Sequence, residues 1–170
     1  MTALATSSER LVIFTYALRA ILGGFALIGA ACAPASAPSQ ITSAGVILED
    51  PWVATTSGGA TVGAGYVVIN NPGPDLERLL SAESPRAARV ELHEMSMTDD
   101  GVMQMRAVSA VDIPAGGSAA LAPGGLHIMM FDITAPIAEG EEIPIPLHFE
   151  RQGDVDAVFI ARPRTASMNH

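Results

Sequence analysis

The sequence contains no lysine and only one cysteine in 170 residues. Its nine basic residues are all arginine and are outnumbered by eighteen Asp and Glu residues, which gives a formal net charge of −9. An acidic surface is not attracted to phosphate backbones, so this balance argues against nucleic acid as a partner. Cys32 ends an apolar stretch near the start of the sequence, so we expect no thiol in the folded domain. This excludes disulfides and a blue-copper electron-transfer site, which needs a cysteine thiolate on the metal.

The sequence also lacks a sustained helical period, an internal repeat, and any convincing Ser/His/Asp, Cys/His or paired-carboxylate arrangement. We therefore expect neither a helical fold nor an enzyme. Short apolar runs alternate with turn residues about every ten positions, a pattern typical of an all-β sandwich or barrel. Only Asp75–Ser84 is expected to form a helical turn. The predicted strands lie near residues 45–55, 62–70, 88–95, 102–108, 118–122, 126–132, 143–150 and 155–162.

Residues 11–32 form an apolar stretch interrupted by Thr15 and Arg19. The uninterrupted part, from Ala20 to Cys32, is followed by small residues, as in a secretory signal peptide. It is shorter than the roughly 20 apolar residues of a membrane span, although an uncleaved leader that anchors the protein is an alternative. We divide the chain into a leader with the start of a linker at 1–37, a linker at 38–44, a β-sandwich domain at 45–162 and a tail at 163–170.

Cys32 and the residues before it, Gly29-Ala30-Ala31, resemble a bacterial lipoprotein attachment site. In that case a lipidated Cys32 would be the first residue of the mature protein and would hold it at a membrane. Cleavage after Ala35 or Ala37 would instead remove the cysteine. In both cases we expect the protein to be exported to the periplasm.

Two histidines and two methionines are the residues best suited to bind a metal: His93, Met105, His127 and Met129. They fall in predicted strands, and residues two apart on a strand, such as His127 and Met129, project from one face. Imidazole nitrogen and thioether sulfur form a soft donor set that suits Cu(I) far better than Mg²⁺ or Ca²⁺. We therefore predict a Cu(I) site formed by these four side chains, near solvent at one end of the sandwich and without a substrate pocket.

The same residues also fit a metal-free interpretation, because methionine in an apolar strand more often fills the core than binds an ion. Met130 points away from Met129 and is expected to pack in the core. His148 has no methionine two positions away and is expected to be structural. Four further soft donors are predicted as an auxiliary metal set: Met95, Met103, Met168 and His170.

Four segments resemble the PCu(A)C family of periplasmic copper chaperones: Val90–Met95, Gly101–Arg106, Ile113–Gly117 and Pro123–Met129. The segments Asp50–Trp52 and Leu80–Pro85 resemble it too, so the resemblance covers about residues 45–162. Each motif alone is unspecific, but their combination in this order is specific to the family.

The ligand motif of that family is a His, a Met after about ten residues, and a His-x-Met after a further twenty-one. Here twenty-one residues separate Met105 from His127, and Met129 follows at the right position. Eleven residues separate His93 from Met105, one more than in the family. The additional residue leaves open whether Met103 or Met105 faces the metal.

The resemblance implies a cupredoxin-like Greek-key β-sandwich that carries Cu(I) in the periplasm. It also implies a copper-accepting partner, either the copper sites of cytochrome c oxidase or a Sco-type thiol protein. We expect the carrier to be a monomer. Copper storage or resistance would use the same residues, and a metal-free interaction module would use them as core. A copper oxidase or dismutase is disfavoured, because such enzymes usually need histidine-rich sites that tolerate Cu(II).

Overall fold

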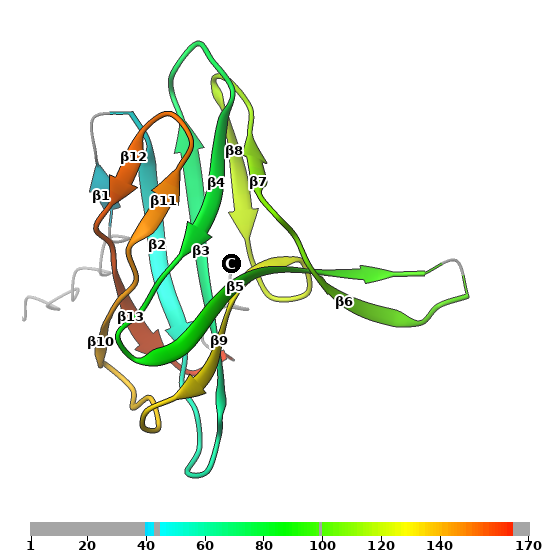
Figure 1. Ribbon diagram of the computed structural model, residues 1–170, viewed down its shortest axis with the longest axis vertical. Helices are drawn as coiled ribbons and strands as arrows, with labels where there is room; N and C mark the ends of the chain where they lie inside the picture. The colour runs from blue at the N-terminus through cyan, green and yellow to red at the C-terminus, as the bar shows by residue number, and fades with distance from the viewer. Residues whose placement is uncertain (1–39, 43–44, 99, 165–170) are drawn as a thin grey trace, which may run out of the picture. The chain divides into compact units, whose positions relative to one another are not determined.

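The computed structural model describes residues 40–42, 45–98 and 100–164. All elements of this part of the chain are β-strands (Figure 1). The described residues include no helix that is long and apolar enough to cross a membrane. Several predicted features lie outside the described residues: the leader, Cys32, Met168 and His170.

The described strands form a nine-stranded sheet and a four-stranded sheet. The larger sheet has the order β10-β13-β2-β3-β8-β9-β5-β6, with β1 paired to β2 and β9 also paired to β3. Its strands are β1 (Gln40–Thr42), β2 (Ile47–Ala54), β3 (Val62–Asn71), β5 (Ala87–Met97), β6 (Met103–Ala107), β8 (Gly117–Leu121), β9 (Leu126–Ile133), β10 (Glu142–Pro144) and β13 (Val158–Arg162). The smaller sheet has the order β12-β11-β4-β7 and consists of β4 (Glu77–Ala82), β7 (Val111–Ile113), β11 (Leu147–Phe149) and β12 (Gly153–Val155).

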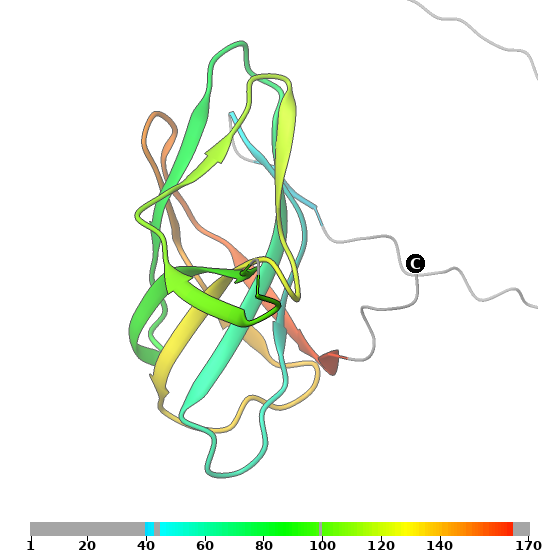
Figure 2. The same cartoon turned by 90° about the vertical axis from the view of Figure 1, so that its right-hand side faces the viewer.

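The apolar core lies between the two sheets, which form two layers in Figure 2. Leu92 of β5, Ile128 and Met130 of β9, and Phe159 of β13 enter this core from the larger sheet, and Leu79 of β4 enters it from the smaller one. Because side chains alternate across a strand, the neighbours of these residues point to the outer face. The prediction of an all-β two-sheet sandwich is confirmed.

The prediction of a helical turn at Asp75–Ser84 is wrong. This segment contains β4, which pairs with β11 on one side and β7 on the other. Leu79 is fully buried in the core, whereas Leu76 and Leu80 are exposed. Packing against two neighbouring strands therefore selects the extended form over the local preference of the segment.

Three smaller differences concern two short strands that were not predicted and one predicted strand that is divided in two. Gln40–Thr42, within the predicted linker, forms β1 and pairs with β2. Val111–Ile113 lies between two predicted strands but forms β7. The predicted strand at 143–150 is divided into β10 and β11, which belong to different sheets. The division falls at Pro146, which has no backbone N–H and cannot donate to a strand ladder.

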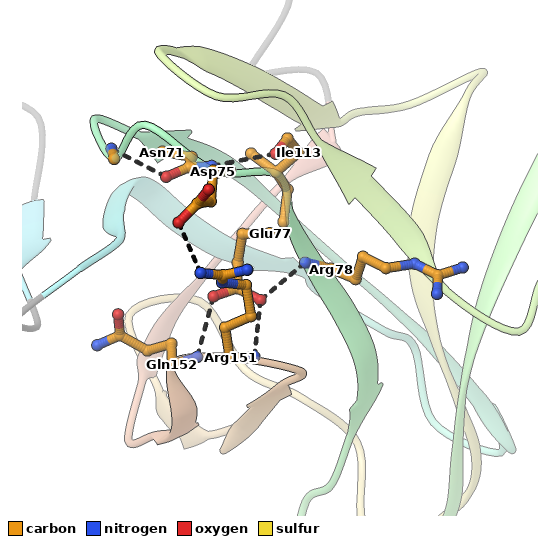
Figure 3. A network of polar contacts seen from close by, with 8 residues as sticks. Asn71, Asp75, Glu77, Arg78, Ile113, Arg151 and Gln152 are labelled. Atoms are coloured by element: carbon orange, nitrogen blue, oxygen red, sulfur yellow. Dashed lines mark hydrogen bonds and ion pairs between the residues drawn. The ribbon is translucent and has the colours of Figure 1, made fainter.

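A network of polar contacts joins the start of β4 to the turn between β11 and β12 (Figure 3). The buried carboxylate of Glu77 accepts hydrogen bonds from the backbone N–H groups of Arg78, Arg151 and Gln152, at 2.8, 3.0 and 2.9 Å. A buried carboxylate is tolerated only when such partners satisfy it. These bonds hold β4 in its extended path.

The hairpin formed by β5 and β6 reaches beyond the sandwich (Figure 1). Its turn is closed by hydrogen bonds between Thr98 and Val102, including one of 2.9 Å from the Thr98 N–H to the Val102 carbonyl. Gly101 takes up the left-handed conformation, with φ of 77°, that this turn requires. All five residues of β6 are exposed, so the outer part of the hairpin extends the sheet away from the core.

Candidate metal centre

The predicted metal-binding side chains lie on the outer face of the larger sheet, opposite the core. Strands β5 and β9 pair with His93 opposite His127, and strands β5 and β6 pair with Met95 opposite Met105. Met129 follows His127 by two residues on β9. Directly opposed residues, and residues two apart on one strand, share a face of the sheet. All five side chains therefore point to the same side.

A cavity of about 160 Å³ opens on this face. Three of the four predicted ligands line it, namely Met105, His127 and Met129, together with Met95 of the auxiliary set. His93 is not part of the wall. His127 is buried and Met105 is exposed, so the wall runs from an interior imidazole to a surface thioether. Three of the predicted ligands therefore border a small cavity on a sheet face, and the absence of a substrate pocket stays a prediction.

His93 packs beside His127, with ring centroids 6.0 Å apart. Its Nε2 lies 2.8 Å from a carboxylate oxygen of Glu91, whereas its Nδ1 is buried and has no hydrogen-bond partner. A neutral imidazole that donates from Nε2 carries its lone pair on Nδ1. The lone pair on Nδ1 of His93 is therefore free to bind a metal, which is the state in which histidine acts as a ligand.

His127 is oriented by the backbone. Its Nδ1 lies 3.0 Å from the carbonyl oxygen of Gly125, so the ring donates from Nδ1 and carries its lone pair on Nε2. The preceding residue, Gly124, lies on the cavity wall and has φ of 87°, which a residue with a side chain rarely adopts. The turn at residues 123–125 thus sets both the tautomer and the position of the imidazole.

Glu91 supports the site through His93. Hydrogen bonds from His93 and from Arg89 hold the pKa of the Glu91 carboxyl below its usual range. The carboxylate is therefore ionised at neutral pH, when it fixes the tautomer of His93. Arg89 in turn lies 4.0 Å from the ring centroid of Phe131 on β9. A carboxylate behind a histidine is a common arrangement around metal-binding imidazoles.

An aromatic pair supports the other histidine. The rings of Trp52 and Tyr66 lie 4.5 Å apart, and the Tyr66 ring lies 6.4 Å from that of His127. Burial raises the pKa of the Tyr66 hydroxyl, so it stays protonated. The Arg162 guanidinium lies 4.6 Å from the Trp52 ring and pairs with Asp50, whose φ of 49° falls at a bulge in β2. The segment Asp50–Trp52 thereby carries the aromatic support of the site.

The structure separates the methionines that the sequence left ambiguous. Met105 lines the cavity, whereas Met103 lies nearer the hairpin tip, opposite Met97. Met130 is fully buried on the core face, which confirms its predicted packing role. The roles of Met105 and Met129 as ligands stay predictions.

No three side chains of His, Cys, Asp or Glu lie together where they could hold a metal ion within residues 45–98 and 100–164. His148, predicted to be structural, bonds to Asp154 at 2.7 Å in the smaller sheet. Two supporting residues were not predicted: Glu91 shares a strand face with His93, which was a usable signal, whereas nothing local marks Tyr66.

The chain is similar to known proteins over most of its length. A family model described as "Putative lipoprotein LpqE-like" matches residues 46–160. The protein named "Putative lipoprotein Lxx21020" from Leifsonia xyli subsp. xyli is 36% identical over 147 residues, which cover 85% of each chain.

Two solved structures share the fold. The "Copper-bound PCuAC domain from PmoF2" matches with a TM-score of 0.63 at 22% identity, over 74% of this chain and 98% of that domain. CuI-DR1885 from Deinococcus radiodurans matches with a TM-score of 0.54 at 25% identity, over 66% and 74%.

Met129 and Met130 form a matched pair, because they are neighbours on β9 that face opposite sides. Met130→Ala removes a fully buried side chain, so we expect the free energy of unfolding to fall by about 2 to 5 kcal/mol. Met129→Ala is expected to cost less stability and to weaken Cu(I) binding far more. Urea denaturation and anaerobic Cu(I) titration against a competing chelator measure the two effects. A Met129→Ala protein with wild-type Cu(I) affinity would show that Met129 is not a ligand.

Glu91→Ala is expected to lower the affinity for Cu(I) by about tenfold, because His93 loses the carboxylate that fixes its tautomer. Glu94→Ala is the matched control, since Glu94 lies next to His93 on the opposite face of β5 and pairs with Arg106. The same chelator competition measures both variants at neutral pH. Equal affinities for the two variants would exclude a supporting role for Glu91.

Proposed function

Because this chain belongs to the LpqE-like family and has the two-sheet fold of PCuAC domains, we propose that it is an exported, monomeric Cu(I) carrier. The resemblance to the PCu(A)C family is confirmed, and with it the prediction that the chain is not an enzyme. Copper is the cargo of such a protein, taken up at one place and released at another.

The observation that carries this proposal is the cavity wall of Met95, Met105, His127 and Met129. Three thioethers and one imidazole form a soft donor set that prefers Cu(I) to hard cations and to Cu(II). The His93 ring packs beside that of His127, and its buried Nδ1 has no hydrogen-bond partner. Two solved proteins of the same fold are named as copper-bound, which supports copper as the ion.

The donor set also suits release. A thioether carries no proton at physiological pH, so the methionines hold copper without competition from acid, whereas the histidines lose affinity once they are protonated. Met105 is 48% exposed, so an incoming ligand can approach the ion from the solvent side. A pair of thiolates binds Cu(I) more tightly than this set and can replace its members one at a time.

We expect the Cu(I)-loaded protein to transfer its ion to an excess of a small dithiol, dithiothreitol, under anaerobic conditions. Gel filtration followed by copper analysis of each fraction measures the transfer. His127→Ala combined with Met129→Ala should bind no tight Cu(I) but keep the far-ultraviolet circular dichroism of the wild type. Copper that stays on the wild-type protein would contradict a carrier and favour storage. A wild-type protein that binds no Cu(I) would leave a metal-free interaction module.

For the recipient we propose the copper sites of cytochrome c oxidase or a Sco-type thiol protein, on the strength of the PCu(A)C resemblance. Copper resistance is the second candidate, because it would use the same donors. Deleting the protein from its host separates the two: loss of oxidase activity at low copper supports delivery, and sensitivity to high copper supports resistance.

The family description and the Leifsonia relative both refer to lipoproteins, which supports lipid anchoring at Cys32 on the outer side of the cytoplasmic membrane. We expect the wild-type protein to partition into the membrane fraction with acyl chains on Cys32, and Cys32→Ser to lose both properties. Fractionation and mass spectrometry of the mature N-terminus measure this. A wild-type protein processed after Ala35 or Ala37 and recovered without lipid would contradict the anchor.

A further inference from the structure

Four methionines lie on one face of the β5–β6 hairpin. Met95 is opposite Met105, and Met97 is opposite Met103. The Cβ atoms of directly opposed residues lie about 5 Å apart, and diagonal neighbours lie about 7 to 8 Å apart. The long thioether side chains can therefore contact one another along the hairpin. We call these four residues the methionine ladder.

The ladder leads from the cavity into solvent. Met95 and Met105 belong to the cavity wall, while Met97 and Met103 stand farther out and are 66% and 48% exposed. The opposite face of the hairpin is polar and carries Glu94, Ser96, Gln104 and Arg106. Large apolar side chains are usually withdrawn from water. Packing in the core does not explain the methionines of this face, because the outer pair is exposed.

We propose that Met97 and Met103 form an outer soft-ion site through which Cu(I) enters and leaves the cavity, an inference that rests on the proposed function. Two neutral thioethers bind a Cu(I) ion weakly, since they leave its coordination incomplete. The ion moves inward when one sulfur of the next pair forms a bond as an outer sulfur releases it. It stays Cu(I) throughout, and no proton or electron is transferred. His127 and Met129 complete the tighter inner site.

The choice of residue favours an ion over a hydrophobic partner. Every exposed methionine in the described residues belongs to the ladder. Both residues of the outer pair are methionine rather than leucine or isoleucine. Methionine also occurs on surfaces that bind proteins, so sulfur must be separated from apolar area by experiment. Leucine does this, because it matches methionine in volume and has no donor atom.

The test uses the full chain with Met97→Leu combined with Met103→Leu, and Gln104→Ala on the polar face as control. Cu(I)-loaded protein is mixed anaerobically with the chelator bathocuproine disulfonate, and the coloured complex is followed by stopped-flow absorbance. We expect the equilibrium affinity of the double variant to be unchanged and its transfer rate to fall about tenfold, the range over which encounter steps usually vary. The control should transfer at the wild-type rate.

A second readout uses wild-type protein labelled with ¹³C at the methionine methyl groups and titrated with Ag(I) as a redox-inert substitute for Cu(I). The Met97 and Met103 methyl signals should shift once the inner site is filled. Signals that stay fixed under excess Ag(I), or wild-type transfer by the leucine variant, would overturn the outer site and favour protein docking on an apolar face. If the wild-type protein binds no Cu(I), the proposed function fails as well; tight binding with unchanged transfer overturns only the ladder.

Discussion

The register between β5 and β9 decides which side chains meet on the outer face of the larger sheet. Leu92 lies opposite Ile128, and the next pair along is His93 opposite His127. Because side chains alternate across a strand, a slip of β9 by one residue would send His127 into the core and Ile128 to the outer face, while His93 kept its place. The buried pair therefore holds the histidines in place. The energy that stabilises the sandwich also fixes the geometry of the candidate site.

Some donors of the candidate site are held in place by neighbouring groups, and others are exposed to solvent. The His127 ring is held by the Gly125 carbonyl and packs near Tyr66, and His93 is held by Glu91. The thioether of Met105, by contrast, belongs to an edge strand whose residues are all exposed. Fixed donors lower the cost of ordering a site around an ion, whereas exposed donors can be replaced by those of an acceptor. The combination fits an ion that must be held and then released.

The parts of the fold that depend on local patterns could be predicted from the sequence. The two-residue spacing of His127 and Met129 predicted a shared face, because alternation is a property of any strand. The extended form of β4 could not be predicted, since the Glu77 carboxylate that holds it bonds to Arg151, 74 positions away. The role of Tyr66 could not be predicted either, because its approach to His127 results from strand pairing and is not marked by any motif in the neighbouring residues.

X-ray absorption spectroscopy at the copper edge of the Cu(I)-loaded protein tests the central claim most directly. It reports which elements surround the bound ion, whatever its recipient. We expect sulfur and imidazole nitrogen together in the first coordination shell. A shell of nitrogen and oxygen alone, with no sulfur, would contradict a copper site built on the methionines of this sheet face.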